Sequence, residues 1–532
     1  MRPGGDASGP VTRSTLTVTL LSFANAAVAL GAQLVIAYVY GAGRETDAYF
    51  VAITLSLLLV NIVATIGPTA LVPIFVESRA RRGEAAAWSF ATSLVIGFVV
   101  VLSVMAVSSF LWAKPFIALA APGLEPARRD LATVLLRDCA PMMLFLGLST
   151  VLNGIYQARS EFTIAAASTL LVPLGTMAGA ALLSPVVGIR AAVLGQAAGA
   201  LAQVLVLGVP LLRPSRLWMP REEARAERAL AIRMMAPYAL GGFAYQLVPV
   251  VERFFGSRLP AGSISYLSIA NRIGNSLMPL LVVGLATTLF TRLAAHGALR
   301  DVEGGRQTLS VALRVLAVIA VPIAVFSPFY AEPLVRLLLE RGRFGPSDAS
   351  AVAAVVPFYV LGSTALGCGM LVERGFHSLL KNTLTPSINV VANMLVYVAL
   401  SAFLAPRLGY AGLAVSFAFF WCSTMLMSSL LLRHRLGPGT GRRIVSVALR
   451  CVLAAAASAV ILAGAYRFVS ALPVLVLLIA AAFGLYAVIA HRLLHVSEIS
   501  LVVTHLRRLV EELAAANPSL RPGPARGGSG GA

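Results

Sequence analysis

Long apolar runs, separated by short charged or glycine- and proline-containing stretches, follow one another along the chain from its first residues to about residue 491. A helix needs about 20 apolar residues to cross the hydrocarbon core of a bilayer. Measured against that length, the runs predict fourteen transmembrane helices, at 14–40, 47–77, 87–113, 132–157, 161–184, 189–212, 233–256, 264–291, 309–331, 350–376, 384–405, 410–432, 444–467 and 472–491. We therefore expect an all-α polytopic membrane protein.

Composition supports this interpretation and excludes other classes. Of the 532 residues, 58% are hydrophobic and 12% are charged, whereas a soluble domain carries about 25% charged residues. Soluble enzymes, fibrous proteins and disordered scaffolds are excluded. The basic excess of 42 − 22 = +20 is spread between apolar runs and forms no continuous basic face, so we expect no nucleic-acid partner.

Candidate chemistry is sparse. The four cysteines are isolated in apolar stretches, and the six histidines fall in or beside charged loops or the tail. A phosphate-binding Gly-x-x-x-x-Gly-Lys loop is absent from the sequence, as is a convincing pair of catalytic carboxylates. We therefore predict no metal, no cofactor and no enzymatic activity, which disfavours an ATP-driven pump and a membrane-embedded glycosyltransferase.

The distribution of arginine predicts the orientation, because basic loops stay in the cytoplasm. One set of loops holds most of the arginines, with clusters at 79–82, 213–228, 300–306 and 433–443, and the same side holds both termini. Both termini are therefore predicted to be cytoplasmic. Residues 496–516 have the pattern of an amphipathic helix lying on the membrane surface, and the glycine- and proline-rich residues 517–532 are typical of a disordered tail.

Three weak sequence patterns recur at nearly one spacing, which indicates an internal duplication. Ala42-Gly43 is repeated at Ala261-Gly262 with an offset of 219, while the glycine at 154 recurs at 375 and the glycine at 188 recurs at 409, both with an offset of 221. Six spans separate the copies, so the two halves have the same orientation. The predicted organisation is a cytoplasmic segment at 1–13, an N-terminal lobe at 14–212, a basic linker at 213–232, a C-terminal lobe at 233–433, two further helices at 444–491, the amphipathic helix and the tail.

Polar residues inside predicted spans are the candidate site residues, because a charge in the membrane normally faces a cavity or a partner. Arg272, with Asn271 and Asn275 beside it, lies about a third of the way into the eighth span. A guanidinium group binds phosphate oxygens in pairs, so Arg272 is the main candidate for an anionic ligand. The alternative is a structural ion pair inside the bundle.

The remaining candidates carry weaker signals. Glu252 and Arg253 lie near the end of the seventh span, where they face a cavity or extend to the membrane surface, and their position there argues against a mid-cavity carboxylate. Asp47 opens the second span and is either a site residue or a helix-start charge. Arg137 and Asp138 are interpreted as a structural pair or as site residues, and Glu373 and Arg374 mark the membrane interface. The uncharged candidates are explained mainly by helix–helix hydrogen bonds, with a lesser chance that each contacts the substrate: Asn25, Gln33, Asn61, Gln246, Asn389 and Asn393.

Several short motifs resemble those of the MurJ/MviN lipid II flippases, a family of the multidrug/oligosaccharidyl-lipid/polysaccharide exporter superfamily. The similarity extends from about residue 14 to 440. It rests on YGAGRETDAYFVA at 40–52, VPIF at 72–75, VER at 251–253, AGSISY at 261–266, ANR at 270–272, LERGRF at 339–344, TLTP at 383–386 and LGYAGLA at 408–414.

This resemblance implies a two-lobed, V-shaped transporter with fourteen helices in the bacterial cytoplasmic membrane. In the family, arginines on helices 1, 2 and 8 contact a pyrophosphate, and helices 13 and 14 hold the lipid tail. Arg272 matches the helix 8 arginine, and Asp47 matches the acidic residue that opens helix 2. The chain departs from the pattern in helix 1, which offers Asn25 but no arginine, and in helix 2, which has Asn61 where the family has a basic pair.

We therefore expect a flippase that moves an undecaprenyl-pyrophosphate-linked saccharide, lipid II or a polysaccharide precursor, from the inner to the outer leaflet. Arg272 would bind phosphate, and Asn25, Asn61 and Asn271 would bind sugar. The expected partners are this lipid-linked substrate, membrane lipids and cell-wall or polysaccharide-synthesis enzymes, with the protein a monomer. Two alternatives stay open: a transport-inactive scaffold for cell-wall enzymes, which the missing arginines favour, and a MATE-like drug or cation antiporter.

Overall fold

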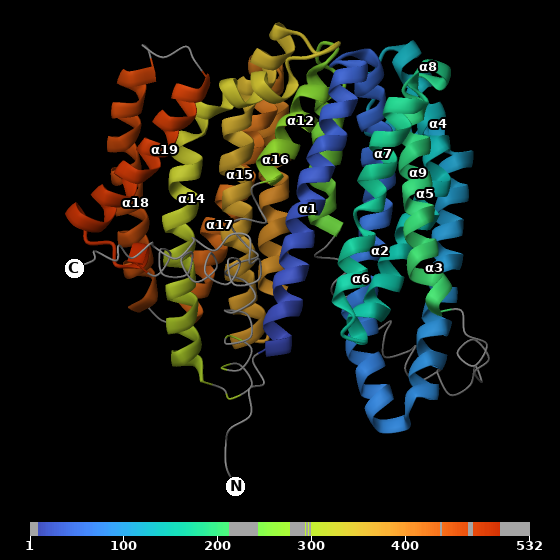
Figure 1. Cartoon of the computed structure of the whole chain (residues 1–532), viewed down its shortest axis with the longest axis horizontal. Helices are drawn as coiled ribbons and strands as arrows, with labels where there is room; N and C mark the ends of the chain where they lie inside the picture. The colour runs from blue at the N-terminus through green and yellow to red at the C-terminus, as the bar shows by residue number, and fades with distance from the viewer. Residues whose placement is uncertain are drawn as a thin grey trace, which may run out of the picture.

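The computed structural model is helical throughout the residues that it describes, which are 9–211, 243–276, 301–382, 384–436, 439–466 and 472–500, with positions 293, 296 and 299. The helices run roughly parallel to one another as two side-by-side bundles, with a further pair of helices on the outer flank of the second bundle (Figure 1). The predicted linker at 213–232, most of the predicted amphipathic helix and the tail lie outside the described residues.

The first bundle contains six predicted spans and two additional short helices. Its packing centres on α5, which contacts α2, α3 and α9, while α1 packs on α7 at the edge that faces the second bundle. The helices are α1 (Gly9–Tyr40), α2 (Arg44–Arg82), α3 (Glu84–Leu111), α4 (Ala113–Ala120), α5 (Pro126–Ala158), α6 (Phe162–Ser168), α7 (Leu171–Leu182), α8 (Ser184–Val187) and α9 (Arg190–Gly208), followed by a 3₁₀ turn at Val209–Leu211.

The second bundle is built around α15, which packs against α12, α14 and α17, and α16 packs on α17. The flanking pair, α18 and α19, is joined to this bundle through α14, and the Tyr486 hydroxyl donates a hydrogen bond to the Val318 carbonyl there. The elements are a helix at 243–256, α12 (Ser263–Ser276), α14 (Val302–Leu339), α15 (Pro346–Leu379), α16 (Leu384–Leu408), α17 (Tyr410–Leu436), α18 (Gly439–Tyr466) and α19 (Leu472–Val488), which continues as a π-helical turn at Ile489–Leu493.

The predicted fold class is confirmed. Eleven stretches of helix within the described residues are long and apolar enough to cross a membrane. The other three predicted spans coincide with α2, whose side chains at 62–70 lie outside the description, and with 243–256 and α12, each of which adjoins residues outside it. The predicted fifth span differs from a continuous helix, because it is divided into α6 and α7 by a turn at Thr169 and Leu170.

Glycines on α7 and α9 allow these two helices to pack backbone to backbone. A methyl group added at Gly195 would lie 2.3 Å from the carbonyl oxygen of Gly175 and 2.7 Å from the Cα of Gly179. Gly199 meets the backbone of Leu171 just as closely. Small residues spaced four apart on facing helices are a common means of close association in membranes, and this seam brings α7 and α9 into direct backbone contact.

The backbone conformations of the duplicated glycines are the same in one pair and different in another. Gly188 before α9 and Gly409 before α17 have φ angles of 58° and 60°, so the same left-handed turn opens both helices. The pair Gly43 and Gly262 does not match, because Gly43 is extended with φ −174° while Gly262 has φ 92°. Gly262 needs its conformation to present its backbone N–H to a carboxylate of the first bundle, as described below.

Candidate functional site

A polar cavity of about 430 Å³ lies between the two bundles. Its walls come from the middle of α1, from the turn between α6 and α7 and from the second half of α12. The lining residues are Ser22, Asn25, Ala26, Ala29, Ala166, Thr169, Arg272, Asn275 and Ser276. The volume is within the range of about 300–1,000 Å³ typical of small-molecule sites, and a break in a transmembrane helix at such a site is common in transporters.

Arg272 is the one charged residue among those that line the polar cavity. Its neighbours on α12, Ala270, Ile273 and Gly274, are buried, and Gly274 packs directly against the backbone of Tyr359 on α15. This close packing turns the opposite face of α12, and with it Arg272, toward the cavity. The Arg272 side chain is exposed and forms no ion pair with the described part of the chain, so the predicted alternative of a structural ion pair finds no partner there.

The three asparagines near Arg272 differ in whether they line the polar cavity and in whether their side chains are already hydrogen-bonded. Asn275 lines the cavity, accepts a hydrogen bond from Ser363 of α15 at 2.9 Å and donates one to Asn271. Asn271 is not among the lining residues, so its side chain orients Asn275. Asn25 on α1 faces the cavity from the other bundle and has no hydrogen-bond partner among the described residues. Asn25 and Arg272 are thus the polar groups that are left for a ligand.

The two bundles are held together at the end of the molecule where α2 and α12 begin, which we call the closed end. The Asp47 carboxylate, 1% exposed, accepts hydrogen bonds from the backbone N–H groups of Gly262 (2.7 Å) and Ser265 (2.9 Å) and from the Ser265 hydroxyl (2.7 Å). Arg128 of α5 lies 3.5 Å from the same carboxylate. Asp47 therefore caps the first turn of a helix in the other bundle, where unpaired N–H groups favour an anion.

Asp47, Thr46, Arg128, Gly262 and Ser265 together form what we call the latch. In it, the Ser265 hydroxyl also lies 2.9 Å from the Thr46 hydroxyl, so the two acceptors share its one hydrogen. The interpretation of Asp47 as a charge at the start of its own helix is therefore incomplete. Its main partners lie more than 210 positions away in the sequence, and no local pattern reports such a contact.

Further contacts between the bundles extend the seal beyond the latch. The backbone N–H of Arg343 donates to the Tyr38 carbonyl at 3.0 Å, and Gly123 N–H donates to the Ser257 hydroxyl at 3.0 Å. Gly41, with φ 70°, lies so close to Arg343 that an added methyl group would be 2.7 Å from its carbonyl oxygen. Glycine is required there by both the left-handed conformation and the close approach.

Glu252 and Arg253 differ from their prediction. Neither extends to the membrane surface: Glu252 is 1% exposed and Arg253 is 7% exposed. Adjacent side chains leave a helix in different directions, but the arginine side chain is long enough to reach its neighbour. Arg253 Nη1 donates a hydrogen bond to Glu252 Oε1 at 2.9 Å. Arg253 Nε also donates to Thr54 of α2 at 3.1 Å, so the pair joins the bundles. The physical reason is burial, which forces the two charges to pair.

The other polar candidates are mostly structural. Asn61 of α2 donates to Gln246 of the helix at 243–256 at 3.1 Å, another contact between the bundles that lies away from the residues lining the polar cavity. Asp138 pairs with Arg190 and not with Arg137, whose Nε reaches the Phe110 carbonyl. Three more are accounted for by hydrogen bonds between or within helices: Asn389 to Ser428, Asn393 to Asn389, and Glu373 from Tyr245.

Sequence reasoning missed several residues that complete these features. Ser22, Thr169 and Ser276 line the polar cavity, and Arg128 and Ser265 belong to the latch. Serine and threonine inside helices usually bond to their own backbone, as Ser22 does with the Val18 carbonyl, so they carry little signal by themselves. Arg128 lies before the predicted fourth span at 132–157, and the sequence carried no signal that this arginine of α5 would be buried beside Asp47.

Comparison with known proteins identifies the family. Residues 36–483 match the family model described as "Lipid II flippase MurJ". The chain is a member of the MurJ family. It is 26% identical over 437 residues to the lipid II flippase MurJ of Burkholderia cenocepacia, covering 80% of this chain and 84% of that protein. Membership in this family makes the chain a multi-pass membrane transporter with a lipid-linked substrate and not an enzyme.

Solved structures share the fold. A lipid II flippase MurJ in an inward closed conformation aligns with a TM-score of 0.75 and 19% identity, covering 90% of this chain and 99% of that one. A multidrug resistance MATE family transporter in an inward-facing conformation aligns with a TM-score of 0.66 and 14% identity, covering 80% and 97%. At these identities the alignments establish the fold that the MurJ-family chain shares with MATE transporters.

Proposed function

We propose that this MurJ-family chain flips an undecaprenyl-pyrophosphate-linked saccharide, lipid II or a related polysaccharide precursor, from the inner to the outer leaflet of the bacterial cytoplasmic membrane. The observation that carries the proposal is an exposed arginine without an ion-pair partner among the described residues, in a polar cavity between two bundles. The head group crosses through this cavity while the tail stays in lipid, and no bond is made or broken.

Arg272 binds the pyrophosphate in this mechanism. Its guanidinium offers paired N–H donors to phosphate oxygens, and Asn25, on the facing helix, donates or accepts hydrogen bonds with the head group. A ligand held by α1 from one bundle and α12 from the other spans the two lobes, so its binding energy depends on how they are rotated. That dependence is what alternating access requires.

In the proposed transport cycle, the latch closes one end of the space between the lobes. In the proposed orientation the termini are cytoplasmic, and the closed end faces the outer side of the membrane. The seal runs from Asp47 to Asn61 along α2, fourteen residues or about 21 Å of helix. The head group enters while this end is sealed and leaves after the latch contacts separate.

The test is depletion of the protein in its native host, with lipid-linked precursors quantified in each leaflet. We expect an undecaprenyl-linked saccharide to accumulate in the inner leaflet, and its head group identifies the cargo. Complementation with Arg272→Ala should fail, and Arg272→Lys should restore transport in part, because lysine keeps the charge but not the paired donors. Arg407→Ala is the matched control, since Arg407 is an exposed arginine that bonds to its own helix.

Two outcomes would overturn the proposal. Absence of any precursor accumulation would favour the scaffold alternative, which the missing helix 1 and helix 2 arginines support. Full complementation by Arg272→Ala would also contradict it, because a scaffold tolerates that change and a flippase that depends on a single cavity arginine does not. The loss of one charge-assisted contact corresponds to about 1.5–3 kcal/mol, roughly a tenfold to hundredfold weaker binding.

A further inference from the structure

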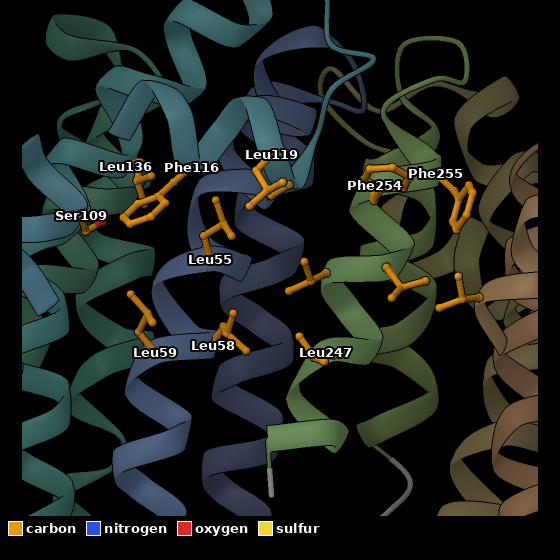
Figure 2. A pocket seen from close by; sticks show the side chains of 14 residues that line it. Leu55, Leu58, Leu59, Ser109, Phe116, Leu119, Leu136, Leu247, Phe254 and Phe255 are labelled. Atoms are coloured by element: carbon orange, nitrogen blue, oxygen red, sulfur yellow. The ribbon is translucent and has the colours of Figure 1, made fainter. Parts of the chain in front are cut away.

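A second hollow lies between the two bundles, and the flipping mechanism does not use it. Its volume is about 390 Å³, and its lining is almost entirely apolar. One wall is formed by Leu55, Leu58 and Leu59 of α2 with residues of α4 and α5, and the other by the helix at 243–256, including Leu247 and Phe254 (Figure 2). It shares no lining residue with the polar cavity. We call it the apolar pocket.

The apolar pocket is lined by exposed side chains at the edge formed by α4. Leu119 of α4 is 76% exposed and Phe116 is 36% exposed, and both side chains line the pocket from the side of the first bundle (Figure 2). Trp112, immediately before α4, is 56% exposed and Lys114 is also exposed. Tryptophan and lysine are typical of the membrane–water interface, so the mouth of the pocket lies just inside that level.

A positive charge lies at the interfacial rim of this mouth. The Arg258 guanidinium lies 4.5 Å from the ring centroid of Phe254, which lines the pocket. The Arg258 side chain is exposed and has no acidic partner among the described residues. Its stem packs against Gly123 at the end of α4, where an added methyl group would be 2.6 Å from Arg258 Cγ. Packing from both bundles therefore holds beside Phe254, a lining residue of the pocket, a guanidinium that has no acidic partner in the described part of the chain.

We propose that the apolar pocket binds one acyl chain of an anionic phospholipid, with its phosphate at Arg258. The volume of about 390 Å³ and the apolar lining suit a hydrocarbon chain. An empty pocket would forfeit dispersion contacts on all its walls. Because surrounding lipid is as apolar as the pocket, burial alone gives little selectivity, and the charge at Arg258 selects the anionic head group.

The occupant contacts both lobes, since Leu58 belongs to one and Phe254 to the other. The walls separate when the lobes rock apart, so a bound chain favours the state in which the latch is closed. This consequence rests on the proposed alternating access, whereas the binding site itself does not.

The experiment uses the full chain in lipid nanodiscs that contain a few per cent of phosphatidylglycerol with a photoactivatable diazirine in one acyl chain. Irradiation followed by mass spectrometry maps the labelled residues. We expect labels concentrated on α2, α4 and 243–256. Filling the pocket from either lobe, with Leu58→Trp or with Val250→Trp, should lower labelling there at least about fivefold. The matched control is Val460→Trp on α18, a lipid-facing position that is 73% exposed.

The head-group part of the proposal has its own variant. Arg258→Gln should reduce pocket labelling by phosphatidylglycerol about fivefold and leave labelling by an equivalent phosphatidylcholine probe nearly unchanged. Elution volume and heat-unfolding midpoint show which variants are folded, and the two filling variants from different lobes guard against failure of either one. Because the readout is lipid labelling, it is independent of whether the chain flips a saccharide.

Three results would overturn the proposal. The first is labelling spread evenly over all lipid-facing helices. The second is undiminished pocket labelling in both filling variants. The third is displacement of the phosphatidylglycerol probe by an equal amount of undecaprenyl phosphate, which would assign the pocket to the cargo's tail.

Discussion

Asp47 of the latch and Arg272 of the polar cavity both lie between the same two lobes, and the surroundings of these two charges are opposite. Asp47 is enclosed by two backbone N–H groups, a hydroxyl and an arginine. Arg272, on the same helix that Asp47 caps, faces a cavity and meets no carboxylate in the described part of the chain. A satisfied charge stabilises one arrangement of the lobes, whereas an unsatisfied one is available to a ligand.

The largest effect should come from Asp47→Ala. The substitution leaves three donors of the other lobe without their acceptor and removes one of the two carboxylates beside Arg128, which is 6% exposed. Breaking a buried ion pair costs about 3–5 kcal/mol, and we expect about 3 kcal/mol because Glu125 still pairs with Arg128. The measurement is the midpoint of heat unfolding in detergent. Asp138→Ala, which breaks a pair within one lobe, should cost less than about 1 kcal/mol.

The milder Asp47→Asn keeps an oxygen for Ser265 and tests whether the latch controls opening. Spin labels at Leu182→Cys and Leu408→Cys, in a background without the native cysteines, report the separation of the lobes at the closed end. We expect the longer distances to gain population in Asp47→Asn. An unchanged distance distribution would mean that the latch stabilises the lobes without governing their movement.

A smaller loss is expected from Gly195→Ala, which tests the close packing of α7 against α9 inside the first lobe and so contrasts a contact within one lobe with the latch between the lobes. The added methyl group would lie 2.3 Å from a carbonyl oxygen of α7, and such overpacking costs about 1–3 kcal/mol. Gly97→Ala on α3 is the matched control, because nothing lies within 4 Å of its added methyl group. Equal unfolding midpoints for the two variants would contradict the close α7–α9 seam.

Arg272→Ala should change stability by less than about 1 kcal/mol, in contrast to Asp47→Ala, because no ion pair is broken. The same variant is expected to abolish transport, so stability and function separate at this residue. Heat unfolding of the purified protein provides the measurement. A fall in midpoint comparable with that of Asp47→Ala would show that Arg272 is a structural residue and would remove the contrast between latch and cavity.

The smallest effect concerns Asp301, which caps α14 as Asp47 caps α12, but at an exposed position. The Gly304 N–H and then His296 hold the pKa of Asp301 below its ordinary value of 3.8. The cap therefore stabilises α14 fully above the ordinary pKa and loses this contribution as the pH falls through the folded-state pKa. We expect Asp301→Asn to be slightly less stable than the wild type at pH 7 and the difference in unfolding midpoint to shrink as the pH falls below 3.8. A difference that grows on acidification would contradict this sign.

Most of the fold was accessible from the sequence because membrane insertion is a local requirement. Each span must satisfy its own backbone hydrogen bonds and present about 20 apolar residues, so run length alone located the helices. The break at Thr169 and Leu170 was not detected, since both flanking halves are equally apolar. Arg272 was also found from the sequence, because a lone arginine within an apolar run is costly unless something uses it.

What the sequence by itself determined, then, is an all-helical MurJ-family membrane protein with one conspicuous intramembrane arginine. Only the tertiary structure decided that Asp47 caps a helix of the other lobe, that Glu252 and Arg253 pair in a buried position, and that α7 and α9 meet at glycines. The physical reason is the sequence separation over which each effect acts. Hydropathy acts residue by residue along the chain, whereas these contacts join segments far apart in the sequence or depend on burial that only the packed lobes create.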